Sequence, residues 1–326
     1  MLCQKLLIYY KNKKLFYYFK MVIKYDIFKP HFNSRFKKFL KEYDYTISLL
    51  FDILKKYKPK IIDAYQYSID QPPPHPLYKY TDKLFLACIL FCILYCPTWE
   101  SFLGPIPGEQ VNKRRLTYIQ YDIFKKFFDT ATQVSISELE RKHKNTIKYV
   151  NIDTTINNNK LCKDITKHLP INKNRKGAKV SFLVNNRGII LSILIDDSSV
   201  HDSKFAIQHI NDFFRKKRIL KLIKKHKNKI YFLADSAYDN NEIKKTLNKI
   251  NIRFIIKPNN KNTKNPHKRR YLTQAQKQIY KNRIKIEHCF GIIKRYPKIN
   301  CVYERTLKSY EGNIFLIAGL LNLKKI

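Results

Sequence analysis

The spacing of apolar residues divides the chain into parts with different patterns. From about residue 29 to residue 145, apolar positions recur every three or four residues, which predicts helices. From residue 146 onward, short runs rich in β-branched residues alternate with helical segments, which predicts an α/β arrangement. We therefore expect a dispensable basic tail over 1–28, a helical region over 29–145 and an α/β region over 146–326.

The helical part contains two segments with clear buried faces. The apolar run over residues 84–96 predicts a buried helix that begins at Thr81 or Asp82. At 13 residues, this run is shorter than the roughly 20 residues that cross a bilayer, so we expect no membrane partner. The other segment places five residues on one stripe, namely Phe36, Phe39, Leu40, Tyr43 and Ile47.

A basic cluster stands at the start of the next predicted helix, over residues 112–133. Lys113, Arg114 and Arg115 follow one another there, and apolar residues recur at helical spacing behind them. Such a helix can be the recognition helix of a helix-turn-helix, in which case these three residues contact DNA. The alternative is an ordinary surface helix whose cations are solvated.

The α/β part predicts strands that end in aspartates. One strand ends at Asp153, a hairpin follows over 179–196, and Asp202 or Ser203 begins a helix. The next buried strand ends at Asp235, and after a further helix and strand comes a long helix from about 273 to 294. This order predicts a mixed sheet flanked by helices.

The composition indicates a polyanionic partner and a reducing environment. The chain has 65 Lys and Arg against 25 Asp and Glu, a net charge of +40, which favours nucleic acid as a partner. Abundant Lys, Ile, Asn, Tyr and Phe also fit a compositional bias, so charge alone leaves both interpretations open. The seven cysteines form no C-x-x-C pair, which argues against a disulfide scaffold or a zinc ribbon.

The strand-end aspartates suggest a metal site. If the two strands are parallel neighbours, Asp153 and Asp235 meet at one edge of the sheet and repel each other unless a cation lies between them. Mg²⁺ or Mn²⁺ prefers such oxygen ligands, and a third carboxylate would complete a site for two ions. Glu287 is the best candidate for that third carboxylate.

Glu287 lies on a helix face with other polar residues. At about 100° per residue, Tyr280, Arg283, Glu287 and Lys294 fall within an arc of roughly 60°. A carboxylate flanked by cations suits a phosphodiester, because the carboxylate binds metal and the cations bind phosphates. The alternative is a surface helix with an ordinary Arg–Glu pair.

These motifs resemble those of the DDE transposases of bacterial-type insertion sequences. Tyr280, Arg283, Glu287 and Lys294 match the family's Tyr-x₂-Arg-x₃-Glu-x₆-Lys signature at every position. The segments NIDTT and LADSAYD are similar to its first and second aspartate motifs, and the resemblance covers about 146–326. One departure is that Thr, rather than Gly or Ser, follows the first aspartate.

The resemblance implies a function and roles for the motif residues. It implies an RNase H-like catalytic core in which Asp153, Asp235 and Glu287 bind two Mg²⁺ or Mn²⁺ ions and catalyse phosphodiester cleavage. Tyr280, Arg283 and Lys294 would contact transposon-end DNA. His201 and Asp202 correspond to a family His-Asp pair that assists the site. Alternatively, Asp202 caps a helix and His201 is a loop residue.

We therefore expect a transposase that binds terminal inverted repeats and target DNA, and that cleaves and joins strands. The resemblance also implies a homodimer on paired DNA ends, inside the cell wherever the host DNA lies. Two alternatives remain at this stage. One is a catalytically inactive, transposase-derived DNA-binding protein, and the other is a basic packaging protein without a site.

Overall fold

The computed structural model describes residues 30–57, 80–142, 147–165, 176–214, 230–261, 265, 267 and 269–326. The predicted basic tail over 1–28 lies outside the described residues. None of the described helices is both long and apolar enough to cross a membrane.

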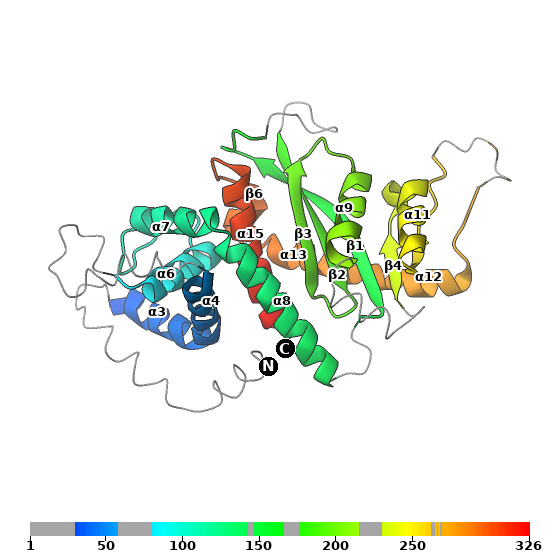
Figure 1. Ribbon diagram of the computed structural model, residues 1–326. Coiled ribbons are helices and arrows are strands. Elements are labelled where there is room, and N and C mark those ends of the chain that lie inside the picture. The colour runs from blue at the N-terminus through cyan, green and yellow to red at the C-terminus, as the bar shows by residue number, and fades with distance from the viewer. Residues whose placement is uncertain are drawn as a thin grey trace.

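Five described helices precede the sheet and pack around a shared apolar core (Figure 1). The predicted stripe from Phe36 to Ile47 is buried. The helix predicted over 84–96 is also buried, and Thr81 caps it by accepting a hydrogen bond from the Leu84 amide. Both predictions are confirmed. The five helices are α3 (Pro30–Glu42), α4 (Asp44–Tyr57), α6 (Asp82–Tyr95), α7 (Gly108–Gln120) and α8 (Ile123–Lys142).

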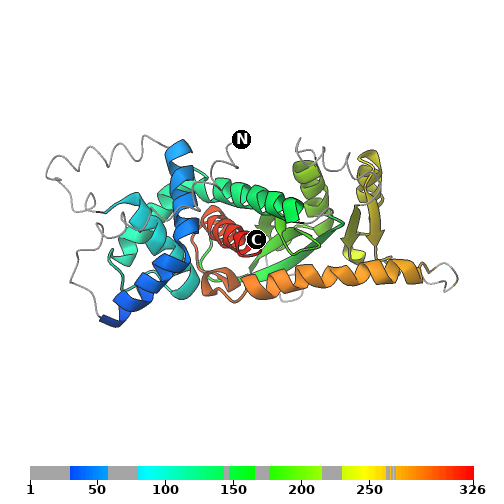
Figure 2. The same ribbon diagram turned by 90° about the horizontal axis from the view of Figure 1, so that it is seen from below.

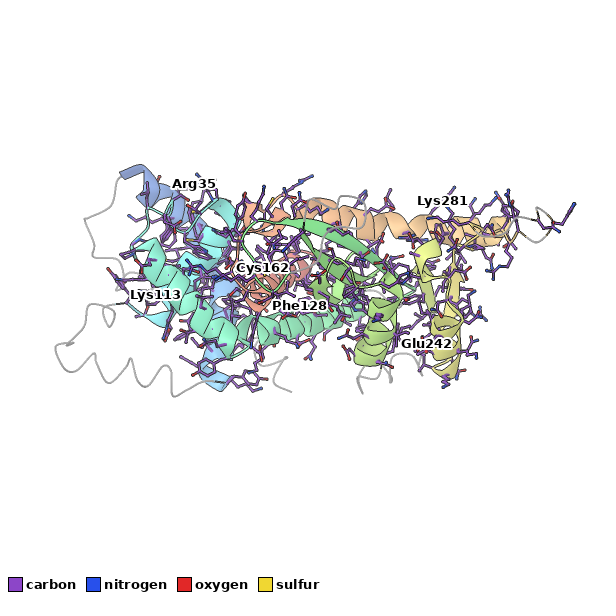
Figure 3. The ribbon with its side chains drawn as sticks, turned by 90° about the horizontal axis from the view of Figure 1, so that it is seen from above. Arg35, Lys113, Phe128, Cys162, Glu242 and Lys281 are labelled. Atoms are coloured by element: carbon purple, nitrogen blue, oxygen red, sulfur yellow. The ribbon has the colours of Figure 1, made fainter. Side chains whose placement is uncertain are left out.

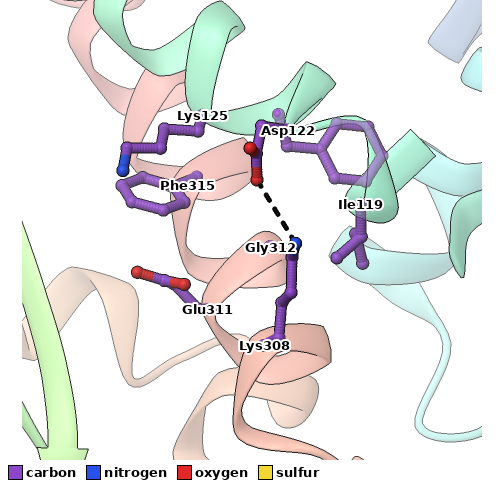
Figure 4. Close-up of a pocket in the computed structure, with 8 residues that line it drawn as sticks. Ile119, Asp122, Lys125, Lys308, Glu311, Gly312 and Phe315 are labelled. Carbon is purple, nitrogen blue, oxygen red and sulfur yellow. Dashed lines mark ion pairs between the residues drawn. The ribbon is translucent and has the colours of Figure 1, made fainter.

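The single helix predicted over 112–133 is in fact two helices, α7 and α8. Asp122 stands between them in a left-handed conformation, with a φ of 56°, which interrupts the helix. Its carboxylate pairs with the Lys308 ammonium at 3.7 Å beside a pocket at the junction of α7, α8 and α15 (Leu307–Leu323) (Figure 4). After the break, α8 packs along α15 (Figure 2). Periodicity alone did not reveal the break, because the apolar spacing continues through it.

The mixed sheet has the strand order β3-β2-β1-β4-β5, and β6 pairs with the far end of β1. The first three strands are antiparallel, whereas β4 and β5 run parallel to β1. This is the RNase H-like arrangement, so the predicted fold class is confirmed. The strands are β1 (Tyr149–Asn159), β2 (Gly177–Asn185), β3 (Ile190–Asp197), β4 (Tyr231–Ala234), β5 (Arg253–Ile256) and β6 (Cys301–Val302).

The first strand is longer than predicted. It was expected to end at Asp153 but continues to Asn159, because its far half stays paired with β2 as far as Asn158 opposite Gly177. Its parallel pairing with β4, however, stops at Asn151. Asp153 therefore lies just beyond the parallel part of β1 rather than at the end of the strand.

Helices cover both faces of the sheet (Figure 1). On one face, α9 (Asp202–Phe214) and α11 (Asn241–Lys249) pack on β1, β3 and β5, and a short 3₁₀ turn, η3 (Ser236–Tyr238), follows β4. On the other face lie α13 (Ile284–Ile293) and α15. A short helix, α14 (Pro297–Asn300), joins α13 to β6.

The long helix predicted from about 273 to 294 forms as three consecutive segments. These are α12 (Gln274–Tyr280), a 3₁₀ turn η5 (Lys281–Arg283) and α13, and they follow one line along the edge of the molecule (Figures 2 and 3). Thr273 and Gln276 form a capping box at the start. On the inner side, Phe290 stacks on Phe182 of β2 with ring centroids 4.7 Å apart, which fixes the helix against the sheet.

One hydrophobic core joins the helical region to the sheet. It includes side chains of α4, α6 and α8 together with those of α13 and α15. The last helix, α15, contacts α6, α7 and α8 as well as β3, so the core runs across residue 145. The division into a DNA-binding region over 29–145 and a catalytic region over 146–326 stays a prediction.

Candidate active site

Asp153 and Asp235 follow equivalent positions of two adjacent parallel strands, and the charge of Asp235 acts on Asp153. The register pairs Asn151 of β1 with Leu233 of β4, and each aspartate comes two residues later in the chain, Asp153 within β1 and Asp235 directly after the end of β4. The Asp235 carboxylate also accepts a hydrogen bond from the Ala237 amide at 2.8 Å, which anchors it at the start of η3. The two aspartates thus meet where the parallel strands part.

The electrostatics of Asp153 show that these carboxylates affect each other. Burial raises the pKa of Asp153, and the negative charges of Asp235 and Asp202 raise it further. The Arg283 guanidinium and a hydrogen bond from the Thr154 amide act against this rise in pKa. Two negative charges therefore act on the partly buried carboxylate of Asp153, and a cation at this place would relieve the repulsion among the three groups.

Arg283 connects the long helix to Asp153 through an ion pair. Its Nη2 donates to Asp153 Oδ2 at 2.6 Å, and its Nη1 donates to the Tyr280 hydroxyl at 2.8 Å. Arg283 is buried, and its Nε–H has no hydrogen-bond partner within the described part of the chain. Two of the four residues in the predicted helix motif thus converge on Asp153.

Glu287 and Lys294 complete the motif on the same helix. Glu287 comes one helical turn after Arg283 and is exposed, while Lys294 caps the end of α13. Burial lowers the pKa of the Lys294 ammonium. Within the described ranges, no three His, Cys, Asp or Glu side chains are arranged to hold a metal ion. Convergence of Glu287 with the two aspartates therefore stays a prediction.

A comparison with known protein families finds one that matches the chain. The family model described as the transposase DDE domain matches residues 153–323, which begin at Asp153 and include Asp235 and Glu287. The chain belongs to this family of DDE transposases. The match spans the sheet and the long helix, which are the elements that position the site.

Solved transposase structures also resemble this DDE transposase at low sequence identity. The piggyBac transposase synaptic complex with hairpin DNA aligns with 8% identity and a TM-score of 0.47, covering 85% of this chain and 73% of that chain. The catalytic domain of Mos1 mariner transposase aligns with 13% identity and a TM-score of 0.26, covering 60% and 90%. No curated protein matches the chain. The family assignment rests on the sequence match.

Asp202 lies close to the paired aspartates of the transposase. It begins α9, accepts a hydrogen bond from Thr154 Oγ1 at 3.1 Å and pairs with Lys179 at 3.0 Å. His201 is exposed, and its Nδ1 lies 2.8 Å from the Ser203 hydroxyl. Asp202 therefore both starts a helix and adds negative charge beside Asp153, whereas His201 has a local contact in the loop.

The arginines of the proposed recognition helix are not on the surface. Arg114 pairs with Asp82 at 2.5 Å, and Arg115, which is 0% exposed, pairs with Glu304 at 2.7 Å. The prediction that Arg114 and Arg115 contact DNA is therefore wrong for this fold, because both guanidinium groups are neutralised inside the protein. Lys113 is exposed and pairs with Glu109, so its contact with DNA stays a prediction.

Sequence reasoning missed Lys179, which neutralises Asp202. This lysine lies near the start of the buried strand β2, and its ammonium also donates to the Val200 carbonyl at 2.6 Å. The sequence signal that could have revealed this pair is a lysine within an apolar strand, because a buried ammonium requires a partner of opposite charge or a hydrogen-bond acceptor.

A buried polar network also lies behind Asp153. The Ser181 hydroxyl donates to the Asp153 carbonyl at 3.3 Å, and His209 Nε2 lies 3.0 Å from that hydroxyl. The other ring nitrogen of His209 lies 3.0 Å from the Ser192 hydroxyl. The network thereby connects α9 and β3 to the backbone of the first aspartate.

The residues present fit a divalent metal. The donors are carboxylate oxygens, which hard cations such as Mg²⁺ and Mn²⁺ prefer, and the mutual repulsion around Asp153 favours a cation there. Asp153 and Asp235 are the paired ligands that the fold positions, with Glu287 as the candidate third ligand. The pocket beside Asp122 contains none of these residues.

Proposed function

We propose that this transposase binds transposon-end DNA and catalyses metal-dependent cleavage and strand transfer. The observation that supports this most directly is that Asp153 and Asp235 come two residues after paired positions of the parallel strands β1 and β4, and that Arg283 of the helix motif donates to Asp153. The basic character of residues 261–326, which hold 16 Lys and Arg against three acids, favours a nucleic-acid substrate.

In the proposed mechanism, Asp153, Asp235 and Glu287 would hold two Mg²⁺ or Mn²⁺ ions. Divalent ions bound there would supply a lower pKa for an attacking water and stabilisation of the negative charge on a leaving 3′ oxygen. Arg283, Tyr280 and Lys294 contribute donors that bind and orient the phosphates of the transposon end. Asp202, which forms an ion pair with Lys179 of β2, adds negative charge beside Asp153.

Two partners follow from the same proposal. The first is double-stranded DNA, as the terminal inverted repeats of the element and as the target. The second is another copy of the chain, because joining paired ends requires a homodimer that brings both ends together.

The test is cleavage of a duplex that carries the inverted repeat flanking the gene, with and without Mg²⁺. Wild-type protein is compared with Asp235→Asn, which keeps the oxygen that caps Ala237 but removes the charge. Asp212→Asn is the matched control, because it removes the same charge at an exposed position of α9. We expect Asp235→Asn to lose at least about a thousandfold in rate, and Asp212→Asn to keep it.

Equal cleavage by wild type and Asp235→Asn would contradict the site assignment. Binding of the duplex without cleavage by wild type would indicate the alternative function, a catalytically inactive DNA-binding protein.

A further inference from the structure

Gly291 is an exposed glycine in the last turn of α13 without an internal role. It has ordinary helical geometry, because Gly188 is the one glycine recorded with positive φ among the described residues. The helix ends at Ile293 and Lys294 is its C-terminal cap, so Gly291 does not have that role either. A Cβ added at Gly291 would meet no atom within 4 Å. Glycine weakens a helix relative to alanine, so its presence here calls for another reason.

Other glycines in the described part of the chain have an evident reason. A Cβ at Gly312 would lie 2.6 Å from Ile119, and one at Gly319 would lie 2.6 Å from Phe127. At Gly108 it would lie 1.8 Å from the Trp99 carbonyl, and at Gly188 the positive φ itself favours glycine. Those glycines allow close packing or a turn inside the protein, whereas Gly291 faces open space.

The position of Gly291 connects that open space to the candidate active site. It comes four residues after Glu287 and three before Lys294, spacings at which helical residues lie on the same face. Arg295, four residues further on, is exposed as well. The bare backbone of Gly291 therefore lies between the candidate metal ligand and two cations.

The outer side of this helix is basic, and none of the described helices or strands packs over it. The helix runs along the edge of the molecule, with the sheet on its inner side only (Figures 2 and 3). Glu287 is the one exposed acid of the helix, whereas its exposed basic residues extend along its length, namely Lys277, Lys281, Lys285, His288 and Arg295. This surface favours a polyanion over a neutral or acidic protein surface.

We infer that Gly291 is the point where the backbone of the substrate DNA passes closest to α13 on its way to Glu287. This inference rests on the proposed function and specifies which part of the helix surface the DNA covers. A side chain at residue 291 would stand between the strand and the carboxylate. Glycine at residue 291 lowers the stability of α13 but leaves room for the DNA strand beside the helix.

The inference makes stability and DNA binding change in opposite directions. Gly291→Ala and Gly291→Gln should each raise the melting temperature, by about 1–2 °C, because both residues favour helix and meet no atoms. The same variants should weaken binding to the transposon-end duplex and slow its cleavage, by a few fold for Ala and by about tenfold or more for Gln. Ala275→Gln is the matched control, since it places the same side chain at an exposed position of α12 and should leave binding unchanged.

Measurements of melting, duplex binding by fluorescence anisotropy, and cleavage decide between the outcomes. A lower melting temperature of the Gly291 variants would show that the position is not open. Unchanged binding and cleavage by Gly291→Gln, with an active wild type, would overturn the inference and leave the proposed function intact. A change in self-association alone would mean that a second copy of the chain covers this face. A wild type that neither binds nor cleaves the duplex would remove the proposed function and this inference together.

Discussion

The guanidinium of Arg283 donates to the carboxylate of Asp153 at 2.6 Å, across 130 residues of sequence. The positive charge of Arg283 therefore occupies the place where a metal ligand is expected to bind a cation. Burial raises the pKa of Asp153, and the positive charge of Arg283 opposes that rise. Arg283 and a divalent ion should compete for the same oxygen.

Removal of this charge should strengthen metal binding. For Arg283→Gln we expect Mn²⁺ to bind at least about fivefold more tightly, or roughly 1 kcal/mol, because the competing charge next to Asp153 is gone. The measurement is the free Mn²⁺ signal in electron paramagnetic resonance during titration of the protein without DNA. Arg253→Gln, which removes an exposed arginine that contacts Tyr231 on another part of the sheet, should show no change. Equal or weaker binding by Arg283→Gln would mean that the two cations do not compete.

The buried pair of Arg115 and Glu304 should be essential for stability. Arg115→Met would leave Glu304 without its cation in a largely buried position, and the loss of one partner of a buried pair costs about 3–5 kcal/mol. Urea unfolding measures this difference. Lys113→Met, two residues earlier and exposed, should stay within about 0.5 kcal/mol of wild type. A small effect of Arg115→Met would show that Glu304 finds another partner or water.

His209 should make the protein less stable in acid. Burial lowers the pKa of His209 to about 3, and no charged side chain contributes to this shift. The unfolded chain therefore binds a proton between pH 6.5 and about 3 that the folded protein excludes. The contribution of His209 is fully present above pH 6.5 and is lost as the pH falls, at up to about 1.4 kcal/mol per pH unit.

His209→Gln tests this pH dependence. The free energy of unfolding, measured by urea at several pH values, should fall less steeply below pH 6.5 in His209→Gln than in wild type. His201→Gln alters an exposed histidine and should keep the wild-type slope. The same slope in His209→Gln and wild type would show that His209 takes up its proton in the folded state.

Gly319 should respond to alanine in the opposite way from Gly291. A Cβ at Gly319 would lie 2.6 Å from the Phe127 ring and 3.3 Å from the Phe128 Cα, where α15 packs on α8. We expect Gly319→Ala to destabilise the protein by about 1–3 kcal/mol, because the two helices must separate. Thermal melting of both variants measures this contrast: the melting temperature should fall for Gly319→Ala and rise for Gly291→Ala. A stabilised Gly319→Ala would show that Phe127 moves aside freely.

The sequence by itself determined the elements and the order of the candidate site. Apolar periodicity predicted the buried α6, the hairpin of β2 and β3, and the long helix, because each depends on contacts close in sequence. Aspartates in or after β-rich runs, together with the spacing of Tyr280, Arg283, Glu287 and Lys294, predicted the candidate site, and of these residues Arg283 donates to Asp153. Their order along the chain was enough to indicate the family.

Only the tertiary structure decided the surroundings of those residues. The sequence contains Arg114 and Arg115 as a basic run, but their partners Asp82 and Glu304 are distant in sequence, so only packing could reveal that both are neutralised inside the protein. The same holds for the ion pair of Arg283 with Asp153 and for the end of the parallel pairing at Asn151. Local pattern fixes which way a side chain faces on its own element, whereas its partner depends on how distant elements pack.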